Sequence, residues 1–111
     1  TELGAVYVHS QNLTDAGLLA MANFQNRLRD LNSLYLYQTA ISSRGLAEIA
    51  TAAPSLNYLV VSSTQVGDDA TRYLRELPKL SRLEIYDTQF TPTGVDRLLR
   101  ALPELKVVWG K

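Results

Sequence analysis

The fold is decided by residues 31–46, which read LNSLYLYQTAISSRGL. Residues 80–95, LSRLEIYDTQFTPTGV, keep the same order: spaced leucines, a threonine, an apolar residue, a hydroxyl residue and a glycine followed by an apolar residue. Units of this kind start at Leu3, Leu31, Leu56, Leu80 and Leu105, which gives spacings of 28, 25, 24 and 25 residues by subtraction. Recurrence at this period along the whole chain predicts a repeat protein.

Apolar residues alternate at the third and fifth positions after each starting leucine, as in Leu34 and Leu36 or Leu83 and Ile85. Such alternation predicts a strand with one buried face. A helical pattern follows each strand, so neighbouring strands must be parallel and joined by right-handed crossovers. We therefore predict an α/β solenoid of about four strand–helix repeats plus a terminal strand, with the sheet on the concave face and the helices on the convex face.

Hydroxyl residues stand where each predicted helix begins. Thr14, Ser42 and Thr91 are expected N-caps, and Gly67 is a weaker one. Three positions later the residue is always small, namely Gly17, Gly45, Ala70 and Gly94. Glycine weakens a helix, so we expect the helix to pass close to the preceding turn at this point. We also expect the hydroxyls of Thr39, Thr64 and Thr88 to bridge the backbones of neighbouring repeats.

The composition fits a single domain over residues 1–111 and excludes several classes of site. Eleven basic residues balance eleven acidic ones, so no net field favours nucleic acid. No apolar run approaches the length of a membrane helix, so we expect no membrane insertion. Cysteine is absent, which excludes disulfides and thiolate metal sites, and we expect no cofactor. The compartment stays open.

The search for catalytic chemistry finds little. His9 is the only histidine, and no acidic residue stands at a comparable repeat position near it to complete a metal site. No nucleophile motif and no phosphate-binding glycine loop is present. Asp68 and Asp69 are adjacent at a predicted helix start, where they serve the helix dipole. We predict that the chain is not an enzyme.

The repeat pattern of residues 31–46 and 80–95, with its Leu-Pro-x-Leu ending, resembles bacterial leucine-rich repeat proteins. This resemblance implies a curved solenoid that binds other proteins through its concave sheet face. The segment Leu-Tyr-Leu-Tyr-Gln-Thr at residues 34–39 also resembles repeat segments that accompany c-type cytochrome domains in bacterial cell-envelope proteins.

The side chains expected on the open face of the sheet are rich in aromatic rings. Five of the six tyrosines and the single tryptophan fall in these rows. The predicted binding face comprises Tyr7, His9, Tyr35, Tyr37, Tyr58, Arg82, Glu84, Tyr86 and Trp109. Rigid aromatic side chains are favoured in binding interfaces, although cross-strand aromatic pairs also stabilise sheets without any ligand. Arg82 and Glu84 are expected to form a surface ion pair.

Two hypotheses follow. The first is a non-catalytic module that binds a protein or peptide through the aromatic concave face. The alternative is a structural spacer or self-association domain of a larger bacterial protein, such as a cytochrome-linked protein of the cell envelope. The chain begins and ends within predicted strands, so we expect it to be a segment of a larger protein. The terminal strand, with Val107, Val108 and Trp109, is expected to pair with another chain or with missing flanks.

Overall fold

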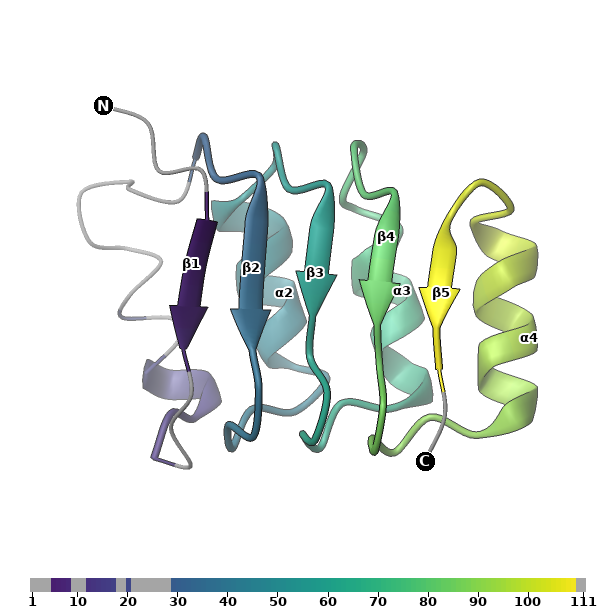
Figure 1. Cartoon of the computed structure of the whole chain (residues 1–111), viewed down its shortest axis with the longest axis horizontal. Coiled ribbons are helices and arrows are strands. Elements are labelled where there is room, and N and C mark those ends of the chain that lie inside the picture. The colour runs from purple at the N-terminus through teal and green to yellow at the C-terminus, as the bar shows by residue number, and fades with distance from the viewer. Residues whose placement is uncertain (1–4, 9–11, 18–19, 21–28, 110–111) are drawn as a thin grey trace.

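Five parallel strands form one sheet in chain order (Figure 1). The structure, a computed structural model, describes residues 5–8, 12–17, 20 and 29–109. The strands are β1 (Ala5–Val8), β2 (Ser33–Leu36), β3 (Tyr58–Val60), β4 (Arg82–Glu84) and β5 (Lys106–Val108). Each strand pairs with the next along the chain, so the sheet grows by one strand per repeat.

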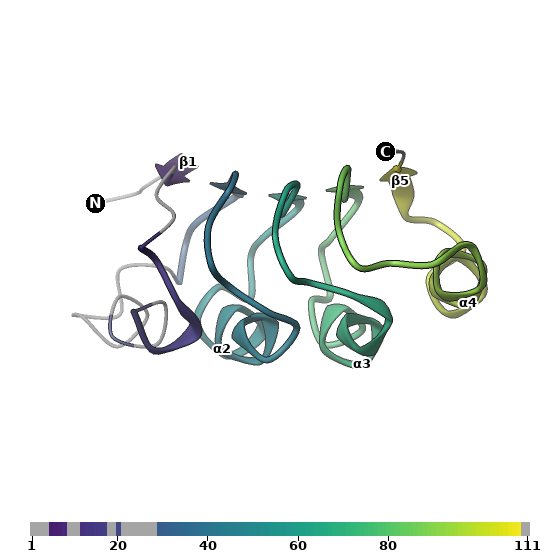
Figure 2. The same ribbon diagram turned by 90° about the horizontal axis from the view of Figure 1, so that it is seen from below.

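Helices cover one face of this sheet and leave the other face open (Figure 2). They are α2 (Gly45–Ala52), the short 3-10 helix η1 (Asp68–Ala70), α3 (Thr71–Leu74) and α4 (Pro92–Ala101). Residues 15–17 are helical as well. This arrangement confirms the predicted fold, a leucine-rich repeat solenoid with its sheet on the concave side.

The core lies between the sheet and the helices. The alternate strand residues Leu34, Leu59 and Leu83 are fully buried and stand side by side in the register. The helices contribute Leu46, Ile49, Leu74 and Leu98, all buried. Because burying a leucine stabilises the fold by about 1.5–3 kcal/mol, this repeated row is the main reason for the regular stacking.

The register of the last strand differs from the prediction by one residue. Val107 pairs with Leu83, and Val108 pairs with Glu84, so Trp109 does not stand beside Glu84 as its sequence position predicted. Paired residues of β4 and β5 are 24 residues apart in the sequence, as Arg82 and Lys106 are, whereas the starting leucines Leu80 and Leu105 are 25 apart. Lys106, missed by the leucine count, therefore lies opposite Arg82.

The turn that follows each strand has a recurrent conformation. Gln38, Ser63 and Asp87 occupy equivalent positions and have positive φ angles of 52°, 59° and 52°. Backbone bonds then tie neighbouring turns together, because the Gln38 amide donates to the Ser62 carbonyl and the Ser63 amide donates to the Tyr86 carbonyl.

The threonines after these turns act within their own repeat. The hydroxyls of Thr39, Thr64 and Thr88 donate to the carbonyls of Leu36, Val61 and Ile85, at 3.5, 2.6 and 3.0 Å. The expectation that they bridge neighbouring repeats was wrong. A threonine side chain is short, and here its hydroxyl bonds groups of its own turn: those of Thr64 and Thr88 also accept from the amides of Val66 and Phe90.

Side chains near the helix starts make the hydrogen bonds between neighbouring repeats. The Asp15 carboxylate accepts from the Ser42 amide (2.8 Å) and hydroxyl (2.5 Å), and the Asp68 carboxylate accepts from the Thr91 amide (2.8 Å) and hydroxyl (2.6 Å). In the intervening repeat the Ser43 hydroxyl accepts from the Gly67 amide at 2.9 Å. We call these contacts the cap ladder, because each joins one helix start to the next.

The caps predicted at Thr14 and Thr91 are present, but the cap predicted at Ser42 was wrong. The N-cap of α2 is Arg44, which makes no side-chain cap hydrogen bond, and the Ser42 hydroxyl donates to Asp15. The Thr91 hydroxyl accepts from the Gly94 amide at 3.0 Å, and the Thr14 hydroxyl accepts from the Gly17 amide at 3.4 Å. The close approach expected at Gly94 is also present: a Cβ added there would lie 1.8 Å from the Asp68 Oδ1. The space is occupied by the carboxylate of the cap ladder, and this explains a glycine inside α4.

Candidate functional site

The candidate site is the open, concave face of the sheet. Its side chains belong to strand residues that alternate with the buried leucines, so β2, β3, β4 and β5 contribute to one surface. The paired rows that cross it are Ser33, Tyr58, Arg82 and Lys106, and then Tyr35, Val60, Glu84 and Val108.

Three tyrosines form a connected aromatic cluster on this face. The rings of Tyr35 and Tyr58 meet edge to face, with centroids 5.2 Å apart and an interplanar angle of 70°. The ring of Tyr37 stacks near Tyr35 at 6.4 Å and 21°. Both arrangements lie in the range in which aromatic pairs are attractive. The cluster therefore presents its rings in fixed orientations.

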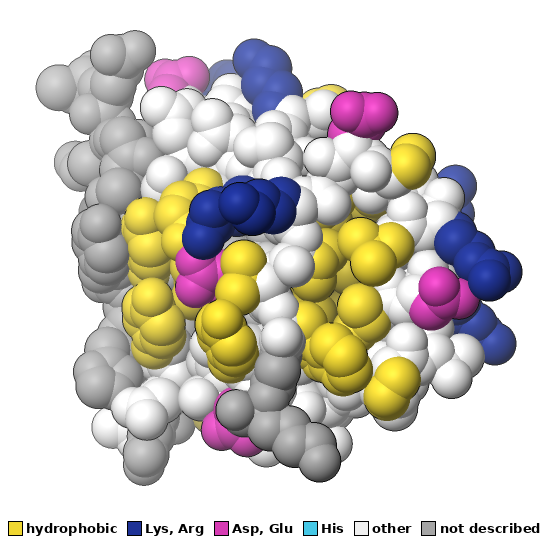
Figure 3. All heavy atoms as spheres, turned by 45° about the vertical axis from the view of Figure 1, so that its right-hand side comes forward, with side chains coloured by type: hydrophobic (Ala, Val, Ile, Leu, Met, Phe, Trp, Pro, Cys, Tyr) yellow, Lys and Arg dark blue, Asp and Glu magenta, His cyan; other side chains and the backbone are white. Residues whose placement is uncertain are grey.

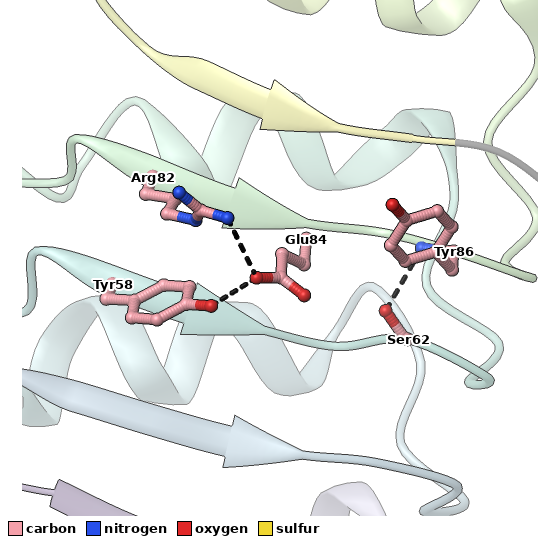
Figure 4. Close-up of polar contacts among 5 residues, drawn as sticks. All are labelled: Tyr58, Ser62, Arg82, Glu84 and Tyr86. Carbon is pink, nitrogen blue, oxygen red and sulfur yellow. Dashed lines mark hydrogen bonds and ion pairs between the residues drawn. The ribbon is translucent and has the colours of Figure 1, made fainter.

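A polar network borders the cluster (Figure 4). The Tyr58 hydroxyl donates to the Glu84 Oε2, and the Arg82 Nη2 lies 3.5 Å from the same oxygen. The Arg82 guanidinium also lies 5.3 Å from the centroid of the Tyr58 ring, within the range of a cation–π interaction. The predicted ion pair of Arg82 with Glu84 is confirmed, and Tyr58 joins it.

The network alters the acidity of Tyr58. The hydrogen bond to Glu84 and the partial burial of the ring raise the pKa of Tyr58 to about 12, while the Arg82 charge acts in the opposite direction. The phenol is therefore a proton donor to Glu84 throughout the physiological range, and it holds the carboxylate in place.

The middle of the face is less open than the alternation predicted. Val60 is fully buried, and Ser62 is only 5% exposed. Both are small residues in the central repeat, among the larger side chains of neighbouring strands. The Ser62 hydroxyl also accepts from the Tyr86 amide at 3.0 Å (Figure 4). At this point the predicted row of exposed side chains is interrupted, because a short side chain between long ones is covered.

The outer part of the face is exposed. The side chains of Tyr37 and Tyr86 are 40% and 41% exposed, which is unusual for large aromatic residues. Both follow the last residue of their strands, β2 and β4, by one or two positions. These two rings are accessible to a partner, whereas Tyr35 and Tyr58 are half-buried and form the floor between the strands.

Three other predicted site residues have different outcomes. Tyr7 pairs with Tyr35 in the backbone register, as expected, while its side chain lies outside the described part of the structure. His9 lies outside the described residues. Trp109 is exposed, but it stands beyond the end of β5 at the C-terminal end of the solenoid.

The described residues contain no group of three His, Asp or Glu side chains that could hold a metal ion. Within the same residues, no helix is long and apolar enough to cross a membrane.

A hollow of about 440 Å³ lies on the opposite, helical side. It is lined by Ala47, Ala50 and Thr51 of α2, by Arg72 and Tyr73 of α3, and by Glu76 just after α3. The Arg72 guanidinium lies 5.5 Å from the Tyr73 ring there. The concave face, with two exposed rings and the hydrogen-bonded network of Tyr58, Glu84 and Arg82, is the stronger candidate.

Comparisons with known proteins bear on the fold alone. The chain matches no family model, and a search of curated proteins finds no significant match. A solved structure of leiomodin-1 actin-binding site 2 is similar, with a TM-score of 0.74 and 16% identity over 96% of this chain and 70% of that chain. This similarity supports the solenoid fold at a low level of sequence identity.

Proposed function

We propose that this chain is a non-catalytic interaction module that binds a protein or peptide through its concave sheet face. The observation that carries the proposal is the position of Tyr37 and Tyr86, two exposed rings on the open face, of which Tyr37 stacks on the cluster of Tyr35 and Tyr58. Aromatic side chains with few rotatable bonds lose little entropy on binding, and they dominate the energy of many interfaces.

The fold supports the same proposal. The similar structure is named as an actin-binding site of leiomodin-1, so a solenoid of this shape serves protein binding in another protein. The partner of the present chain follows from its own surface, which differs in sequence at most positions.

The test is affinity capture with the immobilised chain, in which wild type is compared with the double variant Tyr37→Ala/Tyr86→Ala. Both rings are exposed, so their removal leaves the buried core intact. We expect recovery of the specific partner to fall by at least about tenfold, since interface tyrosines commonly contribute 1–2 kcal/mol each.

The control is Tyr73→Ala, which removes a half-buried tyrosine ring from α3 on the helical side, where it packs against the core. Its partner recovery is expected to equal that of wild type. Equal recovery by all three proteins, each with an unchanged circular dichroism spectrum, would contradict a binding role for the concave face.

A second function, a structural spacer or self-association domain, is favoured by one observation. The last repeat exposes Leu99 on α4 and Trp109 after β5, and Val107 and Val108 of β5 are half-buried. Figure 3 shows hydrophobic side chains gathered on this end of the molecule. In Figures 1 and 2, α4 extends beyond β5, so a copy would meet the helix as well as the strand edge.

Light scattering over a range of concentrations tests this second function. Self-association through the C-terminal end predicts a rise in mass that Leu99→Glu abolishes. A constant monomer mass at high concentration would contradict it, and the concave-face proposal would be unaffected.

A further inference from the structure

We propose that the concave face takes an acidic peptide segment, whose carboxylates pair with Arg82 and Lys106 while a neighbouring apolar side chain packs on Tyr35 and Tyr58. This inference rests on the proposed binding function and specifies the chemistry of the partner.

The first observation is a pair of adjacent cations. Arg82 on β4 and Lys106 on β5 are direct partners in the parallel register. Neighbouring strands lie about 4.8 Å apart, and both residues alternate with the core-facing Leu83 and Val107, so both side chains leave the sheet on the concave side. Like charges placed directly opposite each other destabilise a sheet unless a counter-charge is near.

The second observation is that this counter-charge is incomplete. Glu84 is the carboxylate of this part of the face, and its Oε2 is shared between the Tyr58 hydroxyl and Arg82. In residues 29–109, ion pairs join Arg82 with Glu84 and Asp96 with Arg100, and Lys106 takes part in neither. Of the two adjacent cations, Arg82 alone therefore pairs with the Glu84 carboxylate, which is 15% exposed.

The side chain of Arg82 remains available to a partner. It is 42% exposed, although its Nε is buried and has no hydrogen-bond partner within the described structure. The guanidinium is held over the Tyr58 ring, which fixes its plane and so lowers the entropy cost of binding a carboxylate. Lys106 is exposed beside it.

The third observation is that the cations adjoin the aromatic cluster. Tyr58 touches both groups, since its ring packs against Tyr35 and carries the Arg82 guanidinium. Figure 3 shows Lys and Arg side chains lying across hydrophobic ones on the sheet side of the molecule. Arg82 and Lys106 are the first residues of β4 and β5, whereas Asp87 lies in the turn after β4. A carboxylate next to an apolar residue matches this arrangement.

The experiment selects binders from a library of random short peptides displayed on phage, with the complete 111-residue chain as bait. We expect the selected peptides to be enriched in Asp and Glu beside an aromatic or aliphatic residue. Fluorescence anisotropy then gives Kd for one labelled peptide and for its counterpart in which Asp and Glu are replaced by Asn and Gln. The amide counterpart is expected to bind at least about fivefold more weakly.

Lys106→Glu is the principal variant, because its side chain is exposed and makes no ion pair on which the described fold depends. We expect it to raise Kd for the acidic peptide at least about fivefold and to leave Kd for the amide counterpart nearly unchanged. Arg97→Glu, an exposed residue of α4 with the same change of charge, is the control and is expected to change Kd less than about twofold.

Three results would overturn the inference. Selected peptides that are neutral or basic, or an acidic peptide whose Kd is the same for Lys106→Glu and wild type, would contradict the acidic partner. If the double variant Tyr37→Ala/Tyr86→Ala abolished binding of such a peptide, the proposed binding function of the concave face would still be supported. A library that yields no binder would count against both.

Discussion

Tyr58 links the two halves of the concave face. Its ring packs against Tyr35, supports Arg82 and donates a hydrogen bond to Glu84. From the sequence, Tyr58 could only be placed in the exposed row, and Arg82 and Glu84 could be paired because they stand two residues apart on one strand. The bond from β3 to β4 depends on the rotamer of Tyr58, and a repeat pattern carries no information on rotamers.

Glu84→Gln is predicted to lower the pKa of Tyr58 from about 12 toward its ordinary value near 10, because the charge that holds the phenolic proton is removed. The pKa of the folded state is raised above that of the unfolded state. The resulting stabilisation is therefore fully present below about pH 10 and is lost as the pH rises to about 12.

NMR titration of the tyrosine ring carbons measures the shift directly, and denaturant unfolding between about pH 9 and pH 12, the range in which tyrosines ionise, measures the stability. Glu104→Gln, an exposed carboxylate just before β5, is the control. An unchanged Tyr58 titration in Glu84→Gln would show that the hydrogen bond does not set the pKa.

At the level of secondary-structure elements, the cap ladder determines how one helix start is placed against the next. The sequence predicted the caps of Thr14 and Thr91, because a hydroxyl before a helix has a local acceptor role. It also predicted a crowded position at Gly94. The group that crowds Gly94 could not be predicted. Asp68 lies 26 residues earlier in the sequence (68 to 94), where its position at a helix start indicates only an interaction with the dipole of its own helix.

Gly94→Ala is predicted to destabilise the chain by about 1–3 kcal/mol, although alanine favours a helix, because its Cβ would displace the Asp68 carboxylate from Thr91. In an Asp68→Ala background the clash is absent. There the same substitution is predicted to stabilise the chain by up to about 1 kcal/mol through helix propensity.

Urea unfolding of the four proteins in this double-mutant cycle gives the coupling energy. Asp69→Ala is the control background, since Asp69 is exposed and adjacent to Asp68. Equal effects of Gly94→Ala in all three backgrounds would mean that the Asp68 carboxylate does not occupy the space beside Gly94.

At the scale of the whole molecule, the solenoid followed from the spacing of its leucines, because a strand–helix unit of this length buries its apolar face only by stacking on a copy of itself. The register of β5 could not be derived from this spacing. Counting from Leu105 shifts the register by one residue and pairs Trp109 with Glu84, whereas Val108 is the observed partner. That displacement also concealed Lys106 beside Arg82. The open face was thus predicted as a surface, while the pairing of Arg82 with Lys106 at one end of it required the strand register.

The most direct test of the concave binding face is an NMR measurement of tyrosine ring signals as the displayed-library peptide is titrated into the whole chain. The account predicts that the rings of Tyr37 and Tyr86 shift or broaden in proportion to binding, while the ring of Tyr73, on the helical side, does not change. Perturbation of Tyr73 with no effect on Tyr37 and Tyr86 would place binding on the other side of the molecule and contradict the account.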